Sequence, residues 1–464
     1  MKLFVLCLSS VVALAAAAPA AEFHVALTGS DTNAGTPSAP LRTIQRGADL
    51  AKPGDVITVH AGVYRERISP PRGGASDRKR IVYQAAKGEK VEIKGSEPIK
   101  GWEKVQDDTW KATVPNSFFG GFNPYSDLIH GDWFDARGRQ HHTGAVYLHG
   151  DWLIEAAKLD DLLKPVGGEP LWFGQVEKDK TVLWAQFKGV NPNEAKVEIN
   201  VRQTVFTPEK TGIDYITVRG FDMRHAAPPW APPTAKQIGI VSALWCKGWI
   251  IEDNEISYSS CSGIALGKYG DEWDNRAESA EGYVGTLNRA LTNGWNKATV
   301  GSHVVRNNHI HHCGQTGVVG SLGCSFSSVT GNVIHDIHLT KLFGGAEMAG
   351  IKFHGAIDVT ISNNHIYRCG DVSGIWLDWM GQGAQVTCNL LHDNNGWAGD
   401  LFLEMQHGPL LVANNLFLSK AWIYLNAKGI ALAHNLIASP VVQEREDGRL
   451  TPFHKPHATE VAGL

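Results

Sequence analysis

A short apolar phrase that ends in Asn recurs along the second half of the chain. Its copies are WIIEDNEI, HVVRNNHI, SVTGNVI, VTISNNHI, QVTCNLL, LLVANNLF and ALAHNLI. Val, Ile and Leu alternate with polar residues in these copies, which predicts half-buried strands, and the Gly, Asn and Asp around them predict turns. From the second copy onward the shared Asn recurs every 20 to 32 residues. This length fits one coil of two or three short strands, so the pattern predicts a parallel β-helix.

The shared Asn itself predicts a ladder along the solenoid. An Asn at the same turn of every coil can hydrogen-bond the neighbouring backbone and tolerates left-handed geometry. We therefore interpret these residues as structural. They are Asn254, Asn308, Asn332, Asn364, Asn389, Asn415 and Asn435.

A second phrase in each coil predicts which side chains face outward. Its copies are GIALG, GVVGS, GIKFH, GIWLD, DLFLE and WIYLN. In GIWLD, Ile375 and Leu377 share one face, and Trp376 and Asp378 share the other. The aliphatic face must be the core, so the last position of each phrase forms an outward column: Gly267, Ser321, His354, Asp378, Glu404 and Asn426. Lys352, Trp376, Phe402 and Tyr424 form a second column beside it.

The rest of the chain divides by composition. Residues 1–20 contain an apolar run that ends in Ala18-Pro19-Ala20, as a cleavable signal peptide does. Residues 21–96 predict a cap with one short helix and the first coils, and the Trp-rich alternating segments of residues 97–198 predict an inserted β-sandwich. Residues 199–464 form the main β-helix, in which 268–300 is expected to be a Gly-rich loop that walls a pocket. The fold class is all-β: a right-handed parallel β-helix of the pectin-lyase type with an inserted sandwich.

Charge and cysteine content narrow the function. The net charge of the 464 residues is -4 and Lys and Arg are scattered, which argues against nucleic acid as a partner. After the signal, no stretch approaches the ~18 apolar residues of a membrane span. We expect a protein that is secreted, or periplasmic in a Gram-negative host, and is not bound to a membrane. Six cysteines remain after the signal and are expected to be buried free thiols: Cys246, Cys261, Cys313, Cys324, Cys369 and Cys388.

Asp378 and Glu404 are the candidate catalytic pair. Both stand at the same distance before the next ladder Asn, and neighbouring strands lie about 4.7–4.9 Å apart. Retaining glycosidases need carboxyl groups about 5–5.5 Å apart, so this register favours retention and leaves the two roles open. The competing interpretation is a solvated ladder of carboxylates, but the outward aromatics Trp376, Trp379 and Phe402 favour a sugar site.

Histidine and lysine neighbours complete the candidate site. His354 stands one coil before Asp378, beside Lys352, where it could hydrogen-bond a sugar hydroxyl or orient the nucleophile. The other histidines show no metal-ligand spacing on one strand face. We therefore expect neither a metal nor a cofactor.

Several phrases resemble the glycoside hydrolase family 120 β-xylosidases. They include EFHVALTGSD, GDVITVHAGVYRE, VPNSFFGGFNPY, PWAPPTA, KGWIIEDN, GIWLDW and LFLEMQHGP. The resemblance implies a right-handed β-helix interrupted by an immunoglobulin-like sandwich, with Asp378 as nucleophile and Glu404 as acid/base. It also implies that Trp133 walls the xylose pocket and that Glu347 binds a hydroxyl. Trp230 and His407, in two of the shared phrases, are further expected substrate contacts.

The resemblance has two departures and leaves rival hypotheses. Ala346 stands where the family carries His, and family members continue well past the phrase HATEVAG, so we expect a shortened solenoid. The leading hypothesis is a retaining exo-β-xylosidase that acts on xylobiose and xylo-oligosaccharides. The alternatives are a polysaccharide lyase with Lys352 as the base, and a carbohydrate-binding β-helix without activity.

Overall fold

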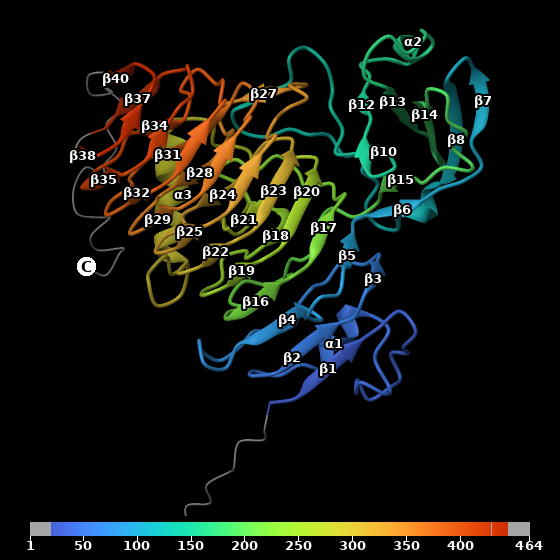
Figure 1. Ribbon diagram of the computed structural model, residues 1–464, viewed down its shortest axis with the longest axis horizontal. Coiled ribbons are helices and arrows are strands. Elements are labelled where there is room, and N and C mark those ends of the chain that lie inside the picture. The colour runs from blue at the N-terminus through green and yellow to red at the C-terminus, as the bar shows by residue number, and fades with distance from the viewer. Residues whose placement is uncertain (1–19, 428, 444–464) are drawn as a thin grey trace, which may run out of the picture.

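The chain folds into a long solenoid with a separate β-rich insert at its side (Figure 1). The computed structural model describes residues 20–427 and 429–443. The predicted signal peptide lies outside these residues except for Ala20. Three parallel sheets run along the solenoid, as a parallel β-helix requires, and we name them the first, second and third sheets. The predicted fold class is therefore confirmed.

A full coil contributes one strand to each sheet, whereas the coils before residue 216 have no strand in the third sheet. The first sheet contains β1 (Glu22–Val25), β2 (Val56–Val59), β4 (Ile81–Ala85), β16 (Ile216–Arg219), β19 (Ile250–Glu252), β22 (Val304–Arg306), β25 (Ser328–Thr330), β29 (Thr360–Ser362), β32 (Gln385–Thr387), β35 (Leu410–Ala413) and β38 (Ile430–Ala433). The second sheet contains β3 (Gly62–Tyr64), β5 (Val91–Lys94), β17 (Asp222–Arg224), β20 (Glu255–Ser259), β23 (His309–Cys313), β26 (Val333–His335), β30 (His365–Tyr367), β33 (Leu390–His392), β36 (Leu416–Phe417) and β39 (Leu436–Ile437). The third sheet contains β18 (Gly239–Ser242), β21 (Ser262–Ala265), β24 (Thr316–Ser321), β28 (Ala349–His354), β31 (Ser373–Asp378), β34 (Leu401–Glu404), β37 (Ile423–Asn426) and β40 (Val441–Gln443).

The predicted asparagine ladder joins the coils at the turn between the first and second sheets. Asn364 shows the repeated pattern: its Oδ1 accepts from the backbone N–H of Asn332 at 3.0 Å, and its Nδ2 donates to the carbonyl of Val329 at 2.9 Å. The same bonds recur from Asn254 to Asn435. The left-handed conformation does not fall on the ladder Asn. It falls on the residue before it, such as Asn363 with φ 56° or Cys388 with φ 57°.

This turn geometry corrects one prediction about the cysteines. Cys388 occupies the left-handed turn position, whose side chain points out of the solenoid, and it is exposed. The other five cysteines after the signal are buried free thiols, as predicted. Cys261 and Cys313 pack in the apolar interior with the strand centres.

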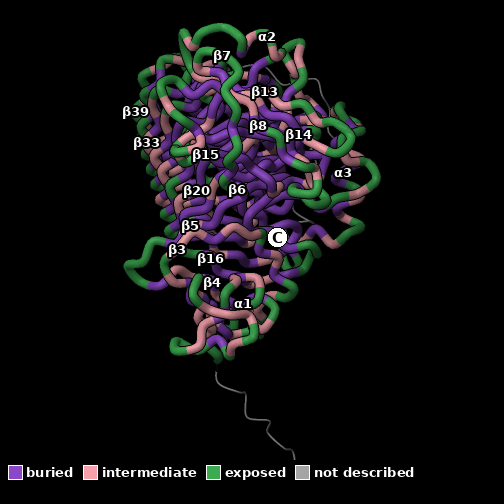
Figure 2. The backbone as a smooth tube through the Cα atoms, turned by 90° about the vertical axis from the view of Figure 1, so that its right-hand side faces the viewer, coloured by how far each residue is buried: buried purple, intermediate pink, exposed green. Residues whose placement is uncertain are grey.

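Alternation along the strands builds the core. Ile375, Leu377, Leu401 and Leu403 are fully buried inside the solenoid. Trp376, Phe402 and Tyr424 lie on the opposite face of the third sheet and form an aromatic cluster of their own. Figure 2 shows the buried interior running through the solenoid beneath exposed outer turns.

The N-terminal end of the solenoid carries one short helix. Helix α1 (Ile44–Leu50) begins after Thr43, whose side chain accepts from the backbone N–H of Arg46. Its buried residues Ile44 and Ala48 pack into the interior of the first coils. The helix therefore covers apolar strand edges that the first coil would otherwise expose.

The insert consists of two facing sheets. One contains β6 (Ser96–Pro98), β10 (Val146–Leu148), β11 (Asp151–Trp152) and β15 (Val197–Asn200). The other contains β7 (Glu103–Gln106), β8 (Thr109–Pro115), β12 (Ile154–Glu155), β13 (Leu171–Val176) and β14 (Lys180–Gln186). The short helices η1 (Asn116–Phe119) and α2 (Leu159–Leu162) lie in its loops. Trp172, Leu183 and Val146 fill the core between the sheets.

A buried ion-pair network fixes the insert to the solenoid. Glu198 at the end of the insert accepts from Lys94 Nζ at 2.8 Å and from Arg65 at 2.5 Å, and both cations belong to early coils. Burial raises the pKa of Glu198, but Lys94, His225 and Arg65 outweigh burial and lower it to about 2. Burial also lowers the pKa of Lys94, so part of the charge attraction is offset by desolvation.

The segment 268–300 is not the loop predicted from its glycines. It contains helix α3 (Ala280–Thr292), which Ser279 caps by accepting from the backbone N–H of Gly282. Tyr283, Leu287 and Ala290 form the buried face of this helix, at a helical spacing. Within the described residues, no helix combines the length and apolar character needed to cross a membrane.

Candidate active site

Strands β28, β31 and β34 run side by side in the third sheet (Figure 1). A pocket lies over their outward face. Register places His354 opposite Asp378, and Asp378 opposite Glu404, so the predicted column exists. The second column, from Lys352 through Trp376 and Phe402, runs beside it. The pocket is lined by Trp133, Ser279, Ala280, Tyr283, Ala346, Glu347, His354, Trp376, Asp378, Trp379 and Glu404.

Asp378 has two chemically different oxygens. Its Oδ2 accepts from Lys352 Nζ at 2.7 Å and lies 3.2 Å from His354 Nε2. Its Oδ1 is buried and has no hydrogen-bond partner among the described residues. A buried carboxylate oxygen without a hydrogen-bond partner destabilises the folded protein, because its lone pairs stay unsatisfied. Such an oxygen is therefore expected to have a function. Oδ1 is therefore the oxygen that is free to act on a bound molecule.

Glu347 extends this charged cluster. Its Oε2 accepts from His354 Nε2 at 2.9 Å and lies 3.4 Å from Lys352 Nζ. Burial alone would raise the pKa of Glu347, but Lys352 and His354 outweigh burial and hold that pKa well below its usual range. Glu347 is thus a buried anion and not a solvated loop carboxylate.

The position of Lys352 bears on whether the cluster of Glu347, His354 and Asp378 could hold a metal ion. Ligand atoms of Glu347, His354 and Asp378 lie within 4.8 Å of one another. The ammonium group of Lys352 already lies between the two carboxylates, and it stands over the Trp376 ring at 3.2 Å from the centroid. The positive charge that the two carboxylates require is therefore supplied by the chain itself.

Aromatic rings form the walls of the pocket. Tyr283 of α3 packs on His354 with ring centroids 5.1 Å apart and meets Trp379 edge-on at 5.4 Å. The pocket also contains two buried nitrogens without partners among the described residues, Trp376 Nε1 and His354 Nδ1. Aromatic walls with a few polar groups aimed inward are typical of carbohydrate sites.

The insert contributes Trp133 through a loop pinned to the solenoid. The two-residue strand β9 (Phe134–Asp135) pairs with β27 (Gly344–Gly345), and the carbonyl of Trp133 accepts from the backbone N–H of Ala346 at 3.1 Å. Trp133 itself has φ 58°, a strained conformation for a bulky residue. This anchoring holds the ring of Trp133 at the pocket beside Glu347.

Three predicted substrate contacts do not line the pocket. Lys352 is fully buried beneath it and reaches it only through Asp378 and Glu347. His407 is half-buried outside the lining, on the loop after β34.

Trp230 is the third of these and supports the pocket from behind. It is buried in the solenoid core, packs against Phe134, and donates its indole N–H to the carbonyl of Asp132 at 2.9 Å. The ring of Trp230 and its N–H donor therefore make their contacts inside the protein. Trp230 fixes the loop that carries Trp133.

The sequence predicted that segment 268–300 walls a pocket, but not that it does so as a helix or through which side chains. Ser279, Ala280 and Tyr283 line the pocket, although 268–300 was expected to be a loop. The signal was present, because Ser279 precedes apolar positions with helical spacing. Its four glycines between Gly270 and Gly294 masked that spacing.

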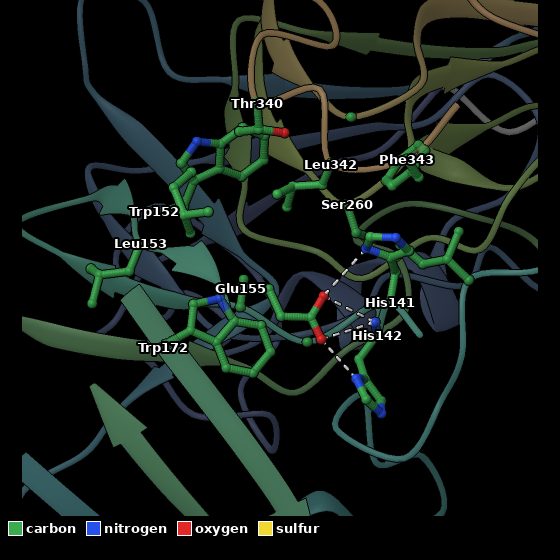
Figure 3. Close-up of a pocket in the computed structure, with 15 residues that line it drawn as sticks. His141, His142, Trp152, Leu153, Glu155, Trp172, Ser260, Thr340, Leu342 and Phe343 are labelled. Atoms are coloured by element: carbon green, nitrogen blue, oxygen red, sulfur yellow. Dashed lines mark hydrogen bonds and ion pairs between the residues drawn. The ribbon is translucent and has the colours of Figure 1, made fainter. Parts of the chain in front are cut away.

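A different pocket lies where the insert meets the solenoid (Figure 3). Trp152, Trp172 and Phe343 are among its lining residues. Its single acidic lining residue is Glu155, which already pairs with His142 at 2.7 Å and Arg139 at 3.1 Å. The lining residues of this pocket therefore offer no pair of carboxyl groups.

Comparisons with known proteins agree with this geometry. A sequence profile described as the insertion domain of glycoside hydrolase 120 matches residues 99–199, and one for a right-handed β-helix region matches residues 240–437. A solved structure, that of XylC in complex with xylose, is 44% identical with a TM-score of 0.88, covering 91% of this chain and 70% of that one. The chain belongs to glycoside hydrolase family 120. This family 120 enzyme is a glycoside hydrolase of the β-xylosidase type, as its sequence phrases indicated.

More distant matches add information about the fold alone. A profile for a protein region of unknown function, DUF1565, matches residues 27–69 of the family 120 enzyme. A solved glycoside hydrolase is 13% identical with a TM-score of 0.52 and covers 96% of this chain and 99% of that one. A search of curated proteins gave no match.

Proposed function

We propose that this family 120 enzyme is a retaining exo-β-xylosidase that releases terminal xylose from xylobiose and short β-1,4-xylo-oligosaccharides. The observation that carries the proposal is the register of Asp378 with Glu404 on adjacent strands. Adjacent strands lie about 4.7–4.9 Å apart, close to the carboxyl separation of about 5–5.5 Å in retaining glycosidases. The xylose complex of XylC supports the choice of sugar.

The first step assigns different roles to the two carboxyl groups. Oδ1 of Asp378 attacks the anomeric carbon, the bond from that carbon to the glycosidic oxygen breaks, and Glu404 donates its proton to that oxygen. Lys352 and His354 support this assignment, because both hold Oδ2 of Asp378 and leave Oδ1 directed at the substrate. Glu404 is less buried than Asp378, which suits a group that exchanges protons with solvent.

The second step restores the enzyme. Glu404 removes a proton from water, the water oxygen attacks the anomeric carbon, and the bond to Asp378 breaks to release xylose with its original β configuration. Glu347, His354 Nδ1 and Trp376 Nε1 are placed to hydrogen-bond the hydroxyl groups, while Trp133 and Tyr283 pack on the sugar faces. A pocket closed by rings suits one terminal sugar better than a long chain, which favours exo action.

The alternative of a lyase with Lys352 as the base has little support. A base must be able to accept a proton, whereas Lys352 is an ammonium group held between Asp378 and Glu347. A binding protein without activity would bind the sugar but not hydrolyse it, so a measurement of turnover distinguishes this alternative from the proposed enzyme.

Azide rescue tests the reaction and the roles together. Aryl β-xyloside and xylobiose are incubated with wild type, Asp378→Gly and Glu404→Ala, and proton NMR follows the first-formed anomer. We expect wild type to release β-xylose first, Asp378→Gly plus azide to give an α-xylosyl azide, and Glu404→Ala plus azide to give the β-azide. First release of the α anomer would exclude retention, and equal turnover by wild type and Asp378→Gly would exclude Asp378 as the nucleophile.

We further propose that the enzyme is exported. The proposal rests on residues 1–20, with their apolar run and Ala18-Pro19-Ala20. Expression in a bacterial host followed by N-terminal sequencing should find a protein that begins near Ala21 outside the cytoplasm. Retention of Met1 on an active, cytoplasmic product would contradict it.

A further inference from the structure

The outer face of the second sheet carries a cluster of imidazole groups far in sequence and in fold from the carboxylate pair. We propose that Glu255, His309, His311 and His335 form a binding site for a divalent transition-metal ion, for which Zn²⁺ is the probe. This set is called the imidazole site below. It is independent of the proposed function, because it belongs to another sheet.

Strand register brings these four residues together. Glu255 of β20 stands opposite His309 of β23, and His311 of β23 stands opposite His335 of β26. His309 and His311 are two positions apart on one strand, so their side chains share the outer face. The intervening Ile310 points into the core and is fully buried. The alternation that points Ile310 into the core therefore also points the side chains of the four candidate ligands outward.

The separations of the polar atoms suit a tetrahedral ion. Glu255 Oε1 lies 3.4 Å from His311 Nε2, and His309 Nε2 lies 2.7 Å from His335 Nε2. Ligand atoms of Glu255, His309 and His311 all fall within 4.8 Å of one another. His335 joins this group through its contact with His309. Two ligands at about 2.0–2.1 Å from a tetrahedral Zn²⁺ are about 3.3 Å apart, so the close imidazole pair must widen and the more distant ligand atoms must move inward.

The proton positions of His335 leave a lone pair for a metal. Its Nδ1 lies 2.6 Å from Oδ2 of Asp336, and a carboxylate only accepts, so Nδ1 carries the proton. Arg368 holds both oxygens of Asp336 at 2.7 Å. Nε2 of His335 is then an acceptor that faces His309. A carboxylate behind a histidine in this way is the usual support of a metal-binding imidazole.

His311 has a neighbour that fits the metal-binding tautomer, because its Nδ1 lies 2.6 Å from Nδ1 of His312 and donation from His311 in this contact leaves Nε2 as an acceptor. The site is also accessible, because His309 is exposed and the side chain of Glu255 is 40% exposed. Three imidazoles and one carboxylate favour zinc and its transition-metal neighbours over Ca²⁺ or Mg²⁺, which prefer oxygen ligands.

A partial copy of the arrangement occurs further along the same sheet and provides a matched control. His365 Nε2 lies 2.8 Å from His392 Nε2, and Nδ1 of His392 lies 2.7 Å from Asp393. Among the described residues, no third ligand group gathers with this pair as Glu255 and His311 do with His309. Two ligands should bind more weakly than four.

Zinc titration of the full chain, purified without a histidine tag and treated with chelator, tests the site. We expect one saturable Zn²⁺ site by calorimetry, a rise in Tm with Zn²⁺ but not Ca²⁺, and a tetrahedral visible spectrum with Co²⁺. His309→Ala should abolish the site, and Asp336→Asn should weaken it by about 10- to 100-fold. His365→Ala should leave the affinity unchanged.

Two results would overturn the proposal: no saturable binding by wild type, or equal Zn²⁺ affinity in wild type and His309→Ala. Circular dichroism of each variant checks folding, and Asp336→Asn provides a test that removes no ligand. Loss of the site in His365→Ala with retention in His309→Ala would place it elsewhere and equally overturn it. Turnover of xyloside by His309→Ala should match wild type.

Discussion

Lys352 donates to Oδ2 of Asp378 from the neighbouring coil at 2.7 Å, while its ammonium group rests on the ring of Trp376. This single contact leaves Oδ1 as the reactive oxygen and places a positive charge between Asp378 and Glu347. It is a side-chain bond between adjacent rungs of one sheet, so its geometry is fixed by the backbone ladder.

Replacement of Lys352 should reduce catalysis more than substrate binding. Lys352→Met keeps the length and removes the charge, and loss of one preorganised donor typically costs about 10²- to 10³-fold in kcat. Steady-state kinetics with an aryl β-xyloside measures this, with the exposed Lys87→Met as control. The folded fraction is determined in parallel, because buried anions left unpaired also destabilise the protein. An unchanged kcat in a folded variant would show that Lys352 does not position Asp378.

Replacement of Tyr283 should show that α3 is part of the pocket. Tyr283→Ala removes ring contacts with His354 and Trp379. Aromatic contacts contribute about 0.5–1.5 kcal/mol, so kcat/KM should fall by up to about tenfold. Tyr283→Phe keeps the ring and should stay close to wild type. Equal losses in both variants would assign the effect to the hydroxyl group instead.

The ion-pair network at the insert should make stability depend on pH. Glu198→Gln removes the anion between Lys94 and Arg65, and we expect the free energy of unfolding to fall by about 3 kcal/mol at neutral pH. The pKa of Glu198 is lowered to about 2, so its contribution is complete above the ordinary value near 4.5 and is lost as pH falls toward 2.

Denaturant unfolding of wild type and Glu198→Gln between pH 7 and pH 2 measures this difference, which should shrink only below about pH 4.5. The exposed pair of Glu103 with Lys111 provides the control, and Glu103→Gln should change stability by less than about 1 kcal/mol. A difference that is constant across this range would contradict an ionic role for Glu198.

Loss of one rung of the asparagine ladder should destabilise the solenoid. Asn364→Ala leaves the backbone N–H of Asn332 and the carbonyl of Val329 without partners. Each buried unsatisfied group costs about 1–3 kcal/mol, so we expect a loss of about 2–4 kcal/mol in chemical unfolding. Asn395→Ala, at an exposed position of the following coil, should change stability by less than about 0.5 kcal/mol. Similar effects of both substitutions would refute the ladder.

The features that follow from local periodicity were predicted well from the sequence. The ladder from Asn254 to Asn435 and the outward column through Asp378 and Glu404 appear in the structure with the predicted register. This succeeds because each coil repeats the same strands, so equal distance from a ladder Asn means adjacency in space. Helix α3 was missed because glycines weakened its pattern, and Cys388 was misplaced because its outward turn position depends on a left-handed φ.

The sequence by itself determined the solenoid, its inward and outward faces, and the stacking of Asp378 on Glu404, because these follow from alternation and repeat length. Tertiary structure alone decided how distant segments complete the pocket. Trp133 arrives from the insert, Tyr283 arrives on α3, and Trp230 supports the wall from inside the core. Periodicity carries no information about such contacts, because the segments that make them lie outside the repeating coils and are positioned by packing.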